Sequence, residues 1–418
     1  MSVEREDERE DRPAQPSNLS TTLIHHAYQP PEGFAAPQVA VHKASTVIFR
    51  DVASLRARAW KDKTGYTYGL HGTPTTFTLE ERIATLEGGL QTLLVPSGLA
   101  AIALVNMALL RYGDEVLIPD NAYGPGKEFA RNELAGWGIT HRLYDPADPQ
   151  RLADMVGPAT RLVWIEAPGS VTMEFPDLAG LLGATRSRGA LSAIDNTWGA
   201  GLAFNAFAVD DGVRPLVGAD VVMQALTKFP SGGGDVLMGS ATTRDPALHA
   251  RIKSTHMRMG LGIGANDAES VLRSLPSLEL RYAAQDQSAR RIAHWLGGRA
   301  EIAQVLHPAL PGSPGHEHWN RVSKRAAGLL SVVFDSGIAA RQVDAFLDSL
   351  RLFKLGYSWA GPMSLAVPYN LAMIRSSPKW RGVLVRFSIG LEAAEDLISD
   401  LEVALDRTFQ SGRPVSQT

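Results

Sequence analysis

Residues 220–235, DVVMQALTKFPSGGGD, place a lysine where a buried strand is predicted to end. Five of the first seven residues are apolar, and Val221 and Val222 are β-branched, which is typical of a buried strand. Lys228 then precedes Pro230 and three consecutive glycines. Burial lowers the pKa of a lysine toward neutrality, so Lys228 could attack a carbonyl and form a Schiff base. On this stretch alone, a lysine that ends a strand and reaches water is the better interpretation.

The composition is that of an ordinary globular protein without cysteine. Of the 418 residues, 44% are hydrophobic and 20% charged, and 41 basic against 44 acidic side chains give a net charge of −3. This balance indicates neither a nucleic-acid nor a membrane partner. The absence of cysteine excludes disulfides, a thiolate nucleophile, iron–sulfur clusters and cysteine-zinc sites. We expect a cytoplasmic protein with no metal site.

A length of 418 residues is too great for one small core and predicts two domains preceded by a short extension. Residues 1–20 alternate acidic residues with arginines and contain no apolar core, which favours a disordered tail over a signal peptide. We expect residues 21–62 to form an arm, residues 63–270 the main, ligand-binding domain, and residues 271–418 a smaller C-terminal α/β domain. The apolar run Leu93–Leu110 is broken by a proline and a glycine, so it predicts a strand end and a buried helix rather than a membrane span.

The main domain alternates predicted strands with helices of about ten residues, which predicts an α/β fold with a mostly parallel, doubly wound sheet. In such sheets ligands bind beyond the carboxyl ends of the strands. Four polar or aromatic residues fall at predicted carboxyl ends, namely Tyr123, Glu166, Asp195 and Lys228. Their convergence at one edge favours a functional role for Lys228.

Two further features suit anions. Ser97 and Gly98 separate a predicted strand from a helix that begins at about Leu99, and the free N–H groups at a helix start attract a phosphate. A plain helix N-cap is the alternative. Arg386 stands inside the apolar strand VLVRFSIG, where its charge needs a carboxylate, either structural or from a substrate.

Pyridoxal phosphate requires this combination of groups. It needs a lysine for the Schiff base, a phosphate cradle, an acid that keeps the pyridine nitrogen protonated, and an aromatic side chain that stacks on the pyridine ring. The candidate groups are Lys228, Ser97-Gly98, Asp195 and Tyr123, while Arg386 would hold the carboxylate of an amino-acid substrate.

From about Ala36 to the last predicted helix, the chain also resembles the Cys/Met-metabolism family of fold-type-I pyridoxal-phosphate enzymes. Each motif is a weak signal alone, but together, in order and at family-like spacing, they are a strong one. They are Tyr66-Thr-Tyr68-Gly69, Leu86-Glu87-Gly88-Gly89, Pro96-Ser97-Gly98-Leu99-Ala100-Ala101, Asn121-Ala122-Tyr123, Asp195-Asn196-Thr197-Trp198 and Thr227-Lys228-Phe229.

Within the family, the chain is most similar to the carbon–sulfur β-lyase branch. Residues Glu166–Glu174 read EAPGSVTME where γ-type members usually carry a Pro-x-Asn-Pro segment, and Tyr357-Ser358-Trp359 adds to the likeness. The resemblance implies β-elimination from L-cystathionine to homocysteine, pyruvate and ammonia, a trans-sulfuration step toward methionine. The alternatives are a broader cysteine-S-conjugate β-lyase, a γ-lyase or γ-synthase, and a non-catalytic binding protein of the same fold.

The resemblance also implies a role for each site residue. Lys228 would carry the cofactor, and either Lys228 or Tyr123 would protonate the leaving thiolate. Tyr123 would stack on the cofactor ring, and Asp195 would pair with the ring nitrogen. The phosphate would be held by Ser97, Gly98, Leu99 and Thr227, and the substrate by Ser358, Trp359 and Arg386. Tyr68 would reach the cofactor and substrate of a neighbouring subunit, so we expect a homo-oligomer, commonly a dimer of dimers.

Three positions depart from the family pattern around the phosphate. Leu70, followed by His71, stands where many members carry an arginine. Ala225 replaces a serine two residues before the lysine, and Gly232-Gly233-Gly234 replaces a Gly-His-Ser run. We therefore expect a weaker hold on the phosphate than is usual in the family.

Overall fold

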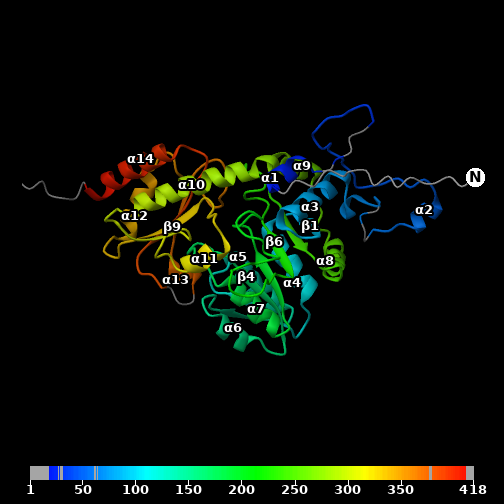
Figure 1. The fold of residues 1–418 in the computed structure, drawn as a ribbon, viewed down its shortest axis with the longest axis horizontal. Helices are drawn as coiled ribbons and strands as arrows, with labels where there is room; N and C mark the ends of the chain where they lie inside the picture. Colours follow the sequence, from blue (N-terminus) through cyan, green and yellow to red (C-terminus); the bar gives the residue numbers. More distant parts are fainter. Residues whose placement is uncertain are drawn as a thin grey trace, which may run out of the picture.

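The computed structural model describes residues 18–26, 28, 32–60, 63, 65–375 and 379–410. The described chain forms two β-sheets with helices around them (Figure 1). Most of the predicted tail, residues 1–17, lies outside the described residues, but its last part differs from the prediction because Leu19 and Ser20 begin helix α1. The predicted domain boundaries stay predictions, although the two sheets fall on either side of residue 270.

The large sheet has the predicted mostly parallel character. Its spatial order is β1-β7-β6-β5-β4-β2-β3, and only β7 runs antiparallel to its neighbours. The sequence did not predict β7. The strands are β1 (Gln91–Val95), β2 (Glu115–Pro119), β3 (Thr140–Tyr144), β4 (Thr160–Glu166), β5 (Leu191–Asp195), β6 (Val221–Gln224) and β7 (Gly239–Thr243).

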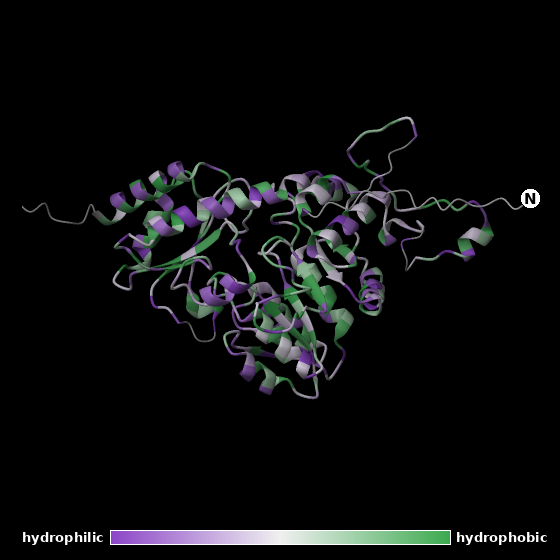
Figure 2. Cartoon of the chain, in the orientation of Figure 1, coloured by the Kyte–Doolittle hydropathy of each residue, from purple (hydrophilic) through white to green (hydrophobic). Residues whose placement is uncertain are grey.

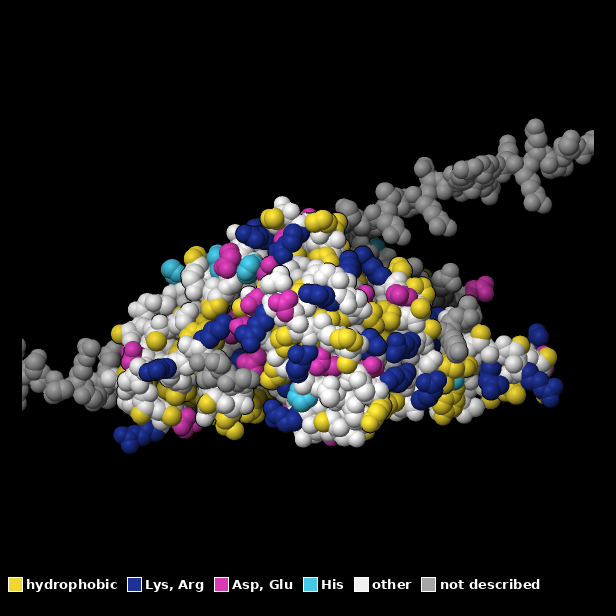
Figure 3. Space-filling model, turned by 90° about the horizontal axis from the view of Figure 1, so that it is seen from below, with side chains coloured by type: hydrophobic (Ala, Val, Ile, Leu, Met, Phe, Trp, Pro, Cys, Tyr) yellow, Lys and Arg dark blue, Asp and Glu magenta, His cyan; other side chains and the backbone are white. Residues whose placement is uncertain are grey.

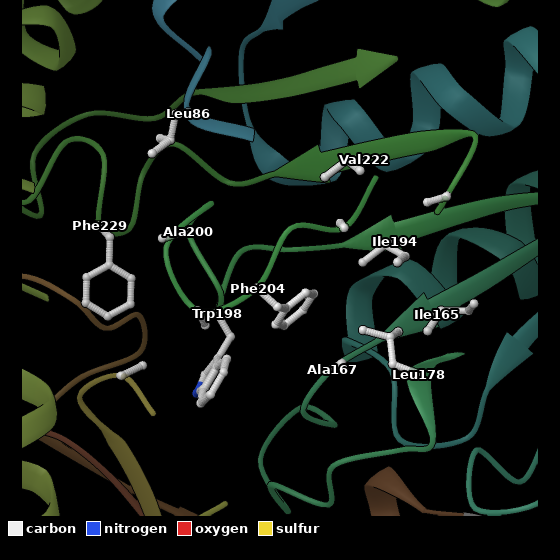
Figure 4. Close-up of a cluster of buried hydrophobic side chains, with 14 of the residues drawn as sticks. Leu86, Ile165, Ala167, Leu178, Ile194, Trp198, Ala200, Phe204, Val222 and Phe229 are labelled. Carbon is white, nitrogen blue, oxygen red and sulfur yellow. The ribbon is translucent and has the colours of Figure 1, made fainter. Parts of the chain in front are cut away.

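Both faces of the large sheet are buried, because side chains alternate between two hydrophobic clusters along each central strand. On β4, Val163 and Ile165 point into one cluster while Leu162 and Trp164 point into the other. Figure 2 shows these strands in green, and Figure 4 shows neighbouring side chains of β4, β5 and β6 on the face that meets Trp198 and Phe204. Burial on both faces explains the nearly continuous apolar runs in the sequence.

The helices of the first 274 residues include those that cover the two faces of the large sheet. α3 and α7 pack into the first cluster, and α4 and α8 into the second. These helices are α1 (Leu19–Ile24), α2 (Val52–Arg56), η1 (Gly69–His71), α3 (Pro74–Glu87), α4 (Gly98–Leu109), α5 (Gly124–Phe129), η2 (Ala130–Leu134), α6 (Pro149–Met155), α7 (Leu178–Ser187), α8 (Pro246–Met259) and α9 (Ala265–Ser274).

The C-terminal part carries a five-stranded sheet in the order β10-β11-β12-β9-β8. Its strands are β8 (Ile302–Leu306), β9 (Leu329–Phe334), β10 (Lys354–Leu355), β11 (Leu365–Tyr369) and β12 (Leu384–Ser388). The remaining helices are η3 (Leu275–Ser277), α10 (Leu278–Leu296), α11 (His316–Val322), α12 (Ala340–Ser349), α13 (Leu371–Ile374), α14 (Ala394–Leu405) and η4 (Asp406–Gln410). Helices α10, α12 and α14 cover one face of this sheet (Figure 1).

Two sequence predictions for the C-terminal part are wrong. The mixed pattern of residues 303–311 predicts a connection, but residues 303–306 lie in strand β8. The apolar pattern predicts one helix over Ala268–Tyr282 and another over Ala289–Trp295, whereas the chain forms α9 and η3 and then α10, which runs unbroken through both Tyr282 and Ala289. In both cases tertiary packing overrides a mixed local pattern, since Tyr282 and Ala289 are both fully buried. Among the described residues, no helix is long and apolar enough to cross a membrane.

Candidate active site

A pocket of about 500 Å³ lies beyond the carboxyl ends of the central strands, with walls from both sheets. Tyr68 is the one predicted site residue that does not line it; its side chain is 47% exposed on the segment before η1. The pocket brings together the other predicted residues, which are Ser97, Gly98, Leu99, Tyr123, Asp195, Thr227, Lys228, Ser358, Trp359 and Arg386.

Lys228 lies four residues beyond the end of β6, in a turn rather than directly at the strand end. Its Nζ donates a hydrogen bond to Ser358 Oγ at 2.7 Å and lies 5.4 Å from the centre of the Trp359 ring. Burial, followed by the positive charge of Arg386, lowers the pKa of Lys228 to about 8, although Asp195 acts in the opposite direction. The amine is therefore available as a base or nucleophile near neutral pH.

Arg386 reaches the pocket because side chains alternate along β12. Val385 and Phe387 pack under the helices of the C-terminal part, whereas Leu384 joins the core of the large sheet, and Arg386 shares the face of Leu384. The Arg386 side chain is buried, donates through Nη2 to Ser358 O at 3.2 Å, and has no partner for Nε among the described residues. This unpaired donor in the pocket wall suits a carboxylate ligand.

Ser358 joins the lysine to the arginine. Its hydroxyl accepts from Lys228 while its carbonyl accepts from Arg386. Ser358 and Ala360 have φ values of 86° and 66°, a left-handed backbone that non-glycine residues rarely adopt. A strained backbone held at a pocket is a feature of functional sites, so the Tyr357–Ala360 loop fits the predicted role in substrate binding.

Asp195 ends β5 beside Glu166, the last residue of β4, in the same register. Thr197 donates to Asp195 Oδ1 from its hydroxyl at 2.5 Å and from its backbone N–H at 3.0 Å. Burial, and then the charge of Asp195, raise the pKa of Glu166 well above its usual value. Burial also raises the pKa of Asp195, but its hydrogen bonds from Thr197 and the positive charge of Lys228 oppose that rise. Because two adjacent buried carboxylates resist double ionisation, we assign the negative charge to Asp195.

Tyr123 caps this edge of the pocket. Its backbone N–H donates to Glu166 Oε2 at 2.7 Å, and the residue is 43% exposed and lines the pocket. Burial is the main cause that raises the pKa of the Tyr123 hydroxyl. This hydroxyl therefore stays protonated at neutral pH and can act as a proton donor.

The start of α4 forms an anion cradle in the same pocket as Lys228. Ser97 accepts the N–H of Ala100 with its hydroxyl and that of Ala101 with its carbonyl, so the N–H groups of Gly98 and Leu99 are left for a ligand. A Cβ atom on Gly98 would lie 2.7 Å from Ala225 Cβ, so only glycine fits here. The Thr227 hydroxyl lines the pocket while it exchanges hydrogen bonds with the backbone of Met238.

These groups fit pyridoxal phosphate. One pocket brings together a cradle that a side chain would fill, a carboxylate with dedicated donors, an amine of lowered pKa and an arginine. The departures from the family pattern have structural counterparts. Ala225 packs on Gly98, and Leu70 lines a separate small cavity near Gly262 instead of the main pocket.

Sequence reasoning missed several residues of the site. Thr197 belongs to the motif Asp195-Asn196-Thr197-Trp198, but the sequence indicates no role for it, and Glu166 is predicted to lie at a strand end without a role in the site. Tyr369, the last residue of β11, and Arg375, which directly follows α13, also line the pocket, and no local pattern singles them out. Among the described residues, no cluster of His, Asp and Glu could hold a metal ion.

A model of the Cys/Met metabolism PLP-dependent enzyme family matches residues 20–406. The chain belongs to this family. Its cofactor is pyridoxal phosphate, and the predicted fold-type-I architecture and enzymatic nature are confirmed.

Relatives within the family carry different names. The chain is 38% identical over 397 residues to a putative cystathionine beta-lyase of Rhizobium johnstonii, covering 93% of this chain and 96% of that protein. It is 34% identical to the cystathionine beta-lyase of Escherichia coli, covering 93% and 98%. An L-alanine/L-glutamate racemase of Wolbachia pipientis is 34% identical, covering 82% and 83%.

Among solved structures, cystathionine gamma synthase from Xanthomonas oryzae superposes with a TM-score of 0.84 at 29% identity, covering 95% of this chain and all of that one. The expected class, carbon–sulfur lyase, is that of the β-lyase relatives. The family is thus established, while its members differ in the reaction that their names state.

Proposed function

We propose that this chain is a carbon–sulfur β-lyase that cleaves L-cystathionine to homocysteine, pyruvate and ammonia. The observation that carries the proposal is the position of Lys228 Nζ, which is hydrogen-bonded to the serine that also binds Arg386. A substrate whose α-carboxylate lies on Arg386 would present its α-carbon near that amine. The family's expected β-lyase loop supports the choice of reaction, since Pro168–Val171 and Met173 line the same pocket.

Each residue of the site has a separate role in the proposed reaction. Bound pyridoxal phosphate supplies an electron sink, which stabilises the electron pair that remains on the α-carbon when the α-proton is removed. Lys228 accepts that proton, because its lowered pKa leaves a neutral fraction near pH 8. Arg386 orients the α-carboxylate. Tyr123 or the protonated Lys228 then gives a proton to the sulfur as the Cβ–S bond breaks.

Product analysis tests the reaction. Purified enzyme given L-cystathionine should release pyruvate and homocysteine in equal amounts, and Lys228→Ala should abolish both. Release of 2-oxobutyrate instead would mean γ-elimination, and loss of optical purity of L-alanine without thiol release would mean a racemase. Either result would contradict the β-lyase proposal, as would full activity in Lys228→Ala.

A broader cysteine-S-conjugate lyase is the second candidate. It is favoured by the apolar and aromatic side chains at the pocket wall beyond Tyr123, including Leu99, Leu237 and Tyr357. Comparable kcat/KM values for L-cystathionine, cystine and uncharged alkyl thioethers of cysteine would support it. A strong preference for L-cystathionine would exclude it.

We also infer a homo-oligomer of at least two chains. Tyr68 is exposed and does not line the pocket of its own chain, as expected if it serves a neighbour. The arm with α2 extends away from the rest of the molecule (Figure 1), and its apolar residues Ile48 and Val52 are exposed. Exposed apolar surface of this kind suits a partner subunit.

A further inference from the structure

Glu87 is a buried carboxyl group that the proposed reaction does not use. It is the last residue of α3 and only 2% exposed. Its Oε2 accepts a hydrogen bond from Asn196 Nδ2 at 2.7 Å. Asn196 follows Asp195 directly, so this bond ties the end of α3 to the turn after β5. The two segments pack closely, because a Cβ atom on Gly201 would lie 2.5 Å from Leu86 O, and Figure 4 shows Leu86 near Ala200.

The hydrogen bonds around Glu87 leave two oxygen atoms unsatisfied. Glu87 Oε1 and Asn196 Oδ1 are both buried, and neither has a partner among the described residues. If Glu87 were a carboxylate, both atoms would be acceptors without donors, and each would cost about 1–3 kcal/mol. A proton on Oε1 would remove the conflict by providing the donor that Asn196 Oδ1 lacks. The acid and the amide would then form a cyclic pair, in which the observed bond from Asn196 Nδ2 is matched by one from the acid.

The charges around Glu87 favour the same state. Asp195 is the described group whose charge acts on Glu87, and it has the same sign. The nearby Arg244 directs its Nε to the carbonyl of Gly88, not to the Glu87 carboxyl. Burial is the main cause that raises the pKa of Glu87 to about 8, with the Asn196 bond opposing and Asp195 adding to the rise.

We propose that Glu87 is a neutral carboxylic acid, paired cyclically with Asn196, and that this pair positions Asp195 without adding a second negative charge beside it. Glu87 is a positioning residue and not a catalytic one. Its role toward Asp195 rests on the proposed function, whereas its protonation does not. Glu87→Gln is the matching isostere, since an amide can make both hydrogen bonds of the neutral acid.

Infrared spectroscopy of the full enzyme tests the protonation directly. A protonated carboxyl group has a carbonyl stretch separate from those of carboxylates and amides. At pH 6 the wild type minus Glu87→Gln spectrum should show this band. Glu80→Gln is the matched control, because Glu80 lies two turns earlier on α3 and is ion-paired with Lys63 at 2.6 Å. An unchanged acid band in Glu87→Gln would overturn the proposal, and so would failure of that variant to fold.

The pH dependence of unfolding provides a second measurement. A folded-state pKa near 8, above the ordinary 4.5, means that the unfolded chain releases the Glu87 proton at lower pH than the folded chain does. Relative to Glu87→Gln, the wild type should therefore lose stability progressively from about pH 4.5 to pH 8, with a constant difference above that. A difference in melting temperature that stays constant from pH 5 to 8 would show an ionised Glu87 and overturn the proposal.

The absorbance of bound pyridoxal phosphate reports on the positioning role. Glu87→Ala should shift the pH midpoint of its absorbance change, because Asp195 loses its support, and Glu87→Gln should restore that midpoint. Equal shifts in both variants would contradict the role of the pair. If the acid band belongs to Glu87 but no pyruvate is released from L-cystathionine, the pair stands and the proposed function falls. If pyruvate is released and the acid band is absent, the proposed function stands and the neutral Glu87–Asn196 pair is wrong.

Discussion

At the scale of single residues, the chemistry of Lys228 depends on neighbours from three separate parts of the chain. Ser358 accepts a hydrogen bond from the Lys228 amine. The charge of Arg386 lowers the pKa of Lys228, and the charge of Asp195 partly offsets this effect. The sequence allowed these four residues to be named, because each stands out locally as a charge or polar group in an apolar or aromatic context. It could not show that Ser358 contacts both Lys228 and Arg386, since that arrangement requires a left-handed backbone at Ser358.

Arg386→Ala should raise KM for amino-acid substrates and leave the cofactor absorbance intact. Loss of a hydrogen bond to a charged group costs about 2–3 kcal/mol, which corresponds to roughly 30- to 150-fold in KM. Arg386→Lys, which keeps the charge but loses the planar fork, should lie between wild type and Arg386→Ala. Steady-state kinetics on L-cystathionine measure this, and an unchanged KM would reassign Arg386 to a structural role.

At the scale of elements, hydrophobic periodicity predicted most strands and helices of the main domain correctly. For example, α4 begins at Gly98, within one residue of its predicted start at about Leu99. The sequence does not predict β7, β8 or α13, which are short or lack an apolar repeat. Such elements are fixed by long-range packing, which a local pattern does not contain. The two elements that shape the pocket, the start of α4 and the loop after β4, permit separate tests.

Gly98→Ala should weaken cofactor binding, because the new Cβ would lie 2.7 Å from Ala225 Cβ and push the start of α4 away from its ligand. Overpacking of this kind costs about 1–3 kcal/mol. Adding Ala225→Gly should recover most of the loss, since it removes the opposing atom. Titration of the cofactor-free wild type, both single variants and the double variant with pyridoxal phosphate measures the change in affinity. Additive effects of the two substitutions on affinity would show that the contact between the two Cβ atoms does not cause the loss.

Arg375→Ala should loosen the loop after β4. The guanidinium bonds the carbonyl of Ser170 and the hydroxyl of Thr172, and it holds a loop in which Val171 and Met173 have φ values of 71° and 57°. Without these bonds, the strained loop should exchange amide hydrogens faster, and kcat/KM should fall by roughly 10- to 100-fold.

Hydrogen exchange of peptides that span residues 168–174 measures the effect. Arg251→Ala is the matched control, because Arg251 bonds the carbonyl of Leu109 away from the pocket. Equal protection of the loop in Arg375→Ala and wild type would mean that the arginine does not hold it.

At the scale of the whole molecule, the pocket forms where the two sheets meet. The large sheet contributes Asp195 and the turn with Lys228, and the small sheet contributes Arg386. The sequence predicted this division from strand-end residues and one buried arginine. It could not predict which face of β12 meets the large sheet, since that depends on the packing of α10, α12 and α14. The face in Figure 3 mixes acidic and basic side chains, in line with the near-neutral composition.

Mixed oligomers test whether Tyr68 serves a neighbouring subunit. Tyr68→Ala and Lys228→Ala should each be nearly inactive alone. After co-refolding, a mixed dimer has one site with Lys228 from one chain and Tyr68 from the other, so activity should return. If Tyr68 acted in its own chain, every site of the mixture would lack one of the two groups, and no activity would return.

The central claim is that Lys228 bonds pyridoxal phosphate, and reductive labelling tests it most directly. The purified enzyme is treated with borohydride, digested and analysed by mass spectrometry. We predict a single phosphopyridoxyl group on the peptide that contains Lys228, and no label in Lys228→Ala. A label on another lysine, or no label in an enzyme that releases pyruvate from L-cystathionine, would contradict the assignment.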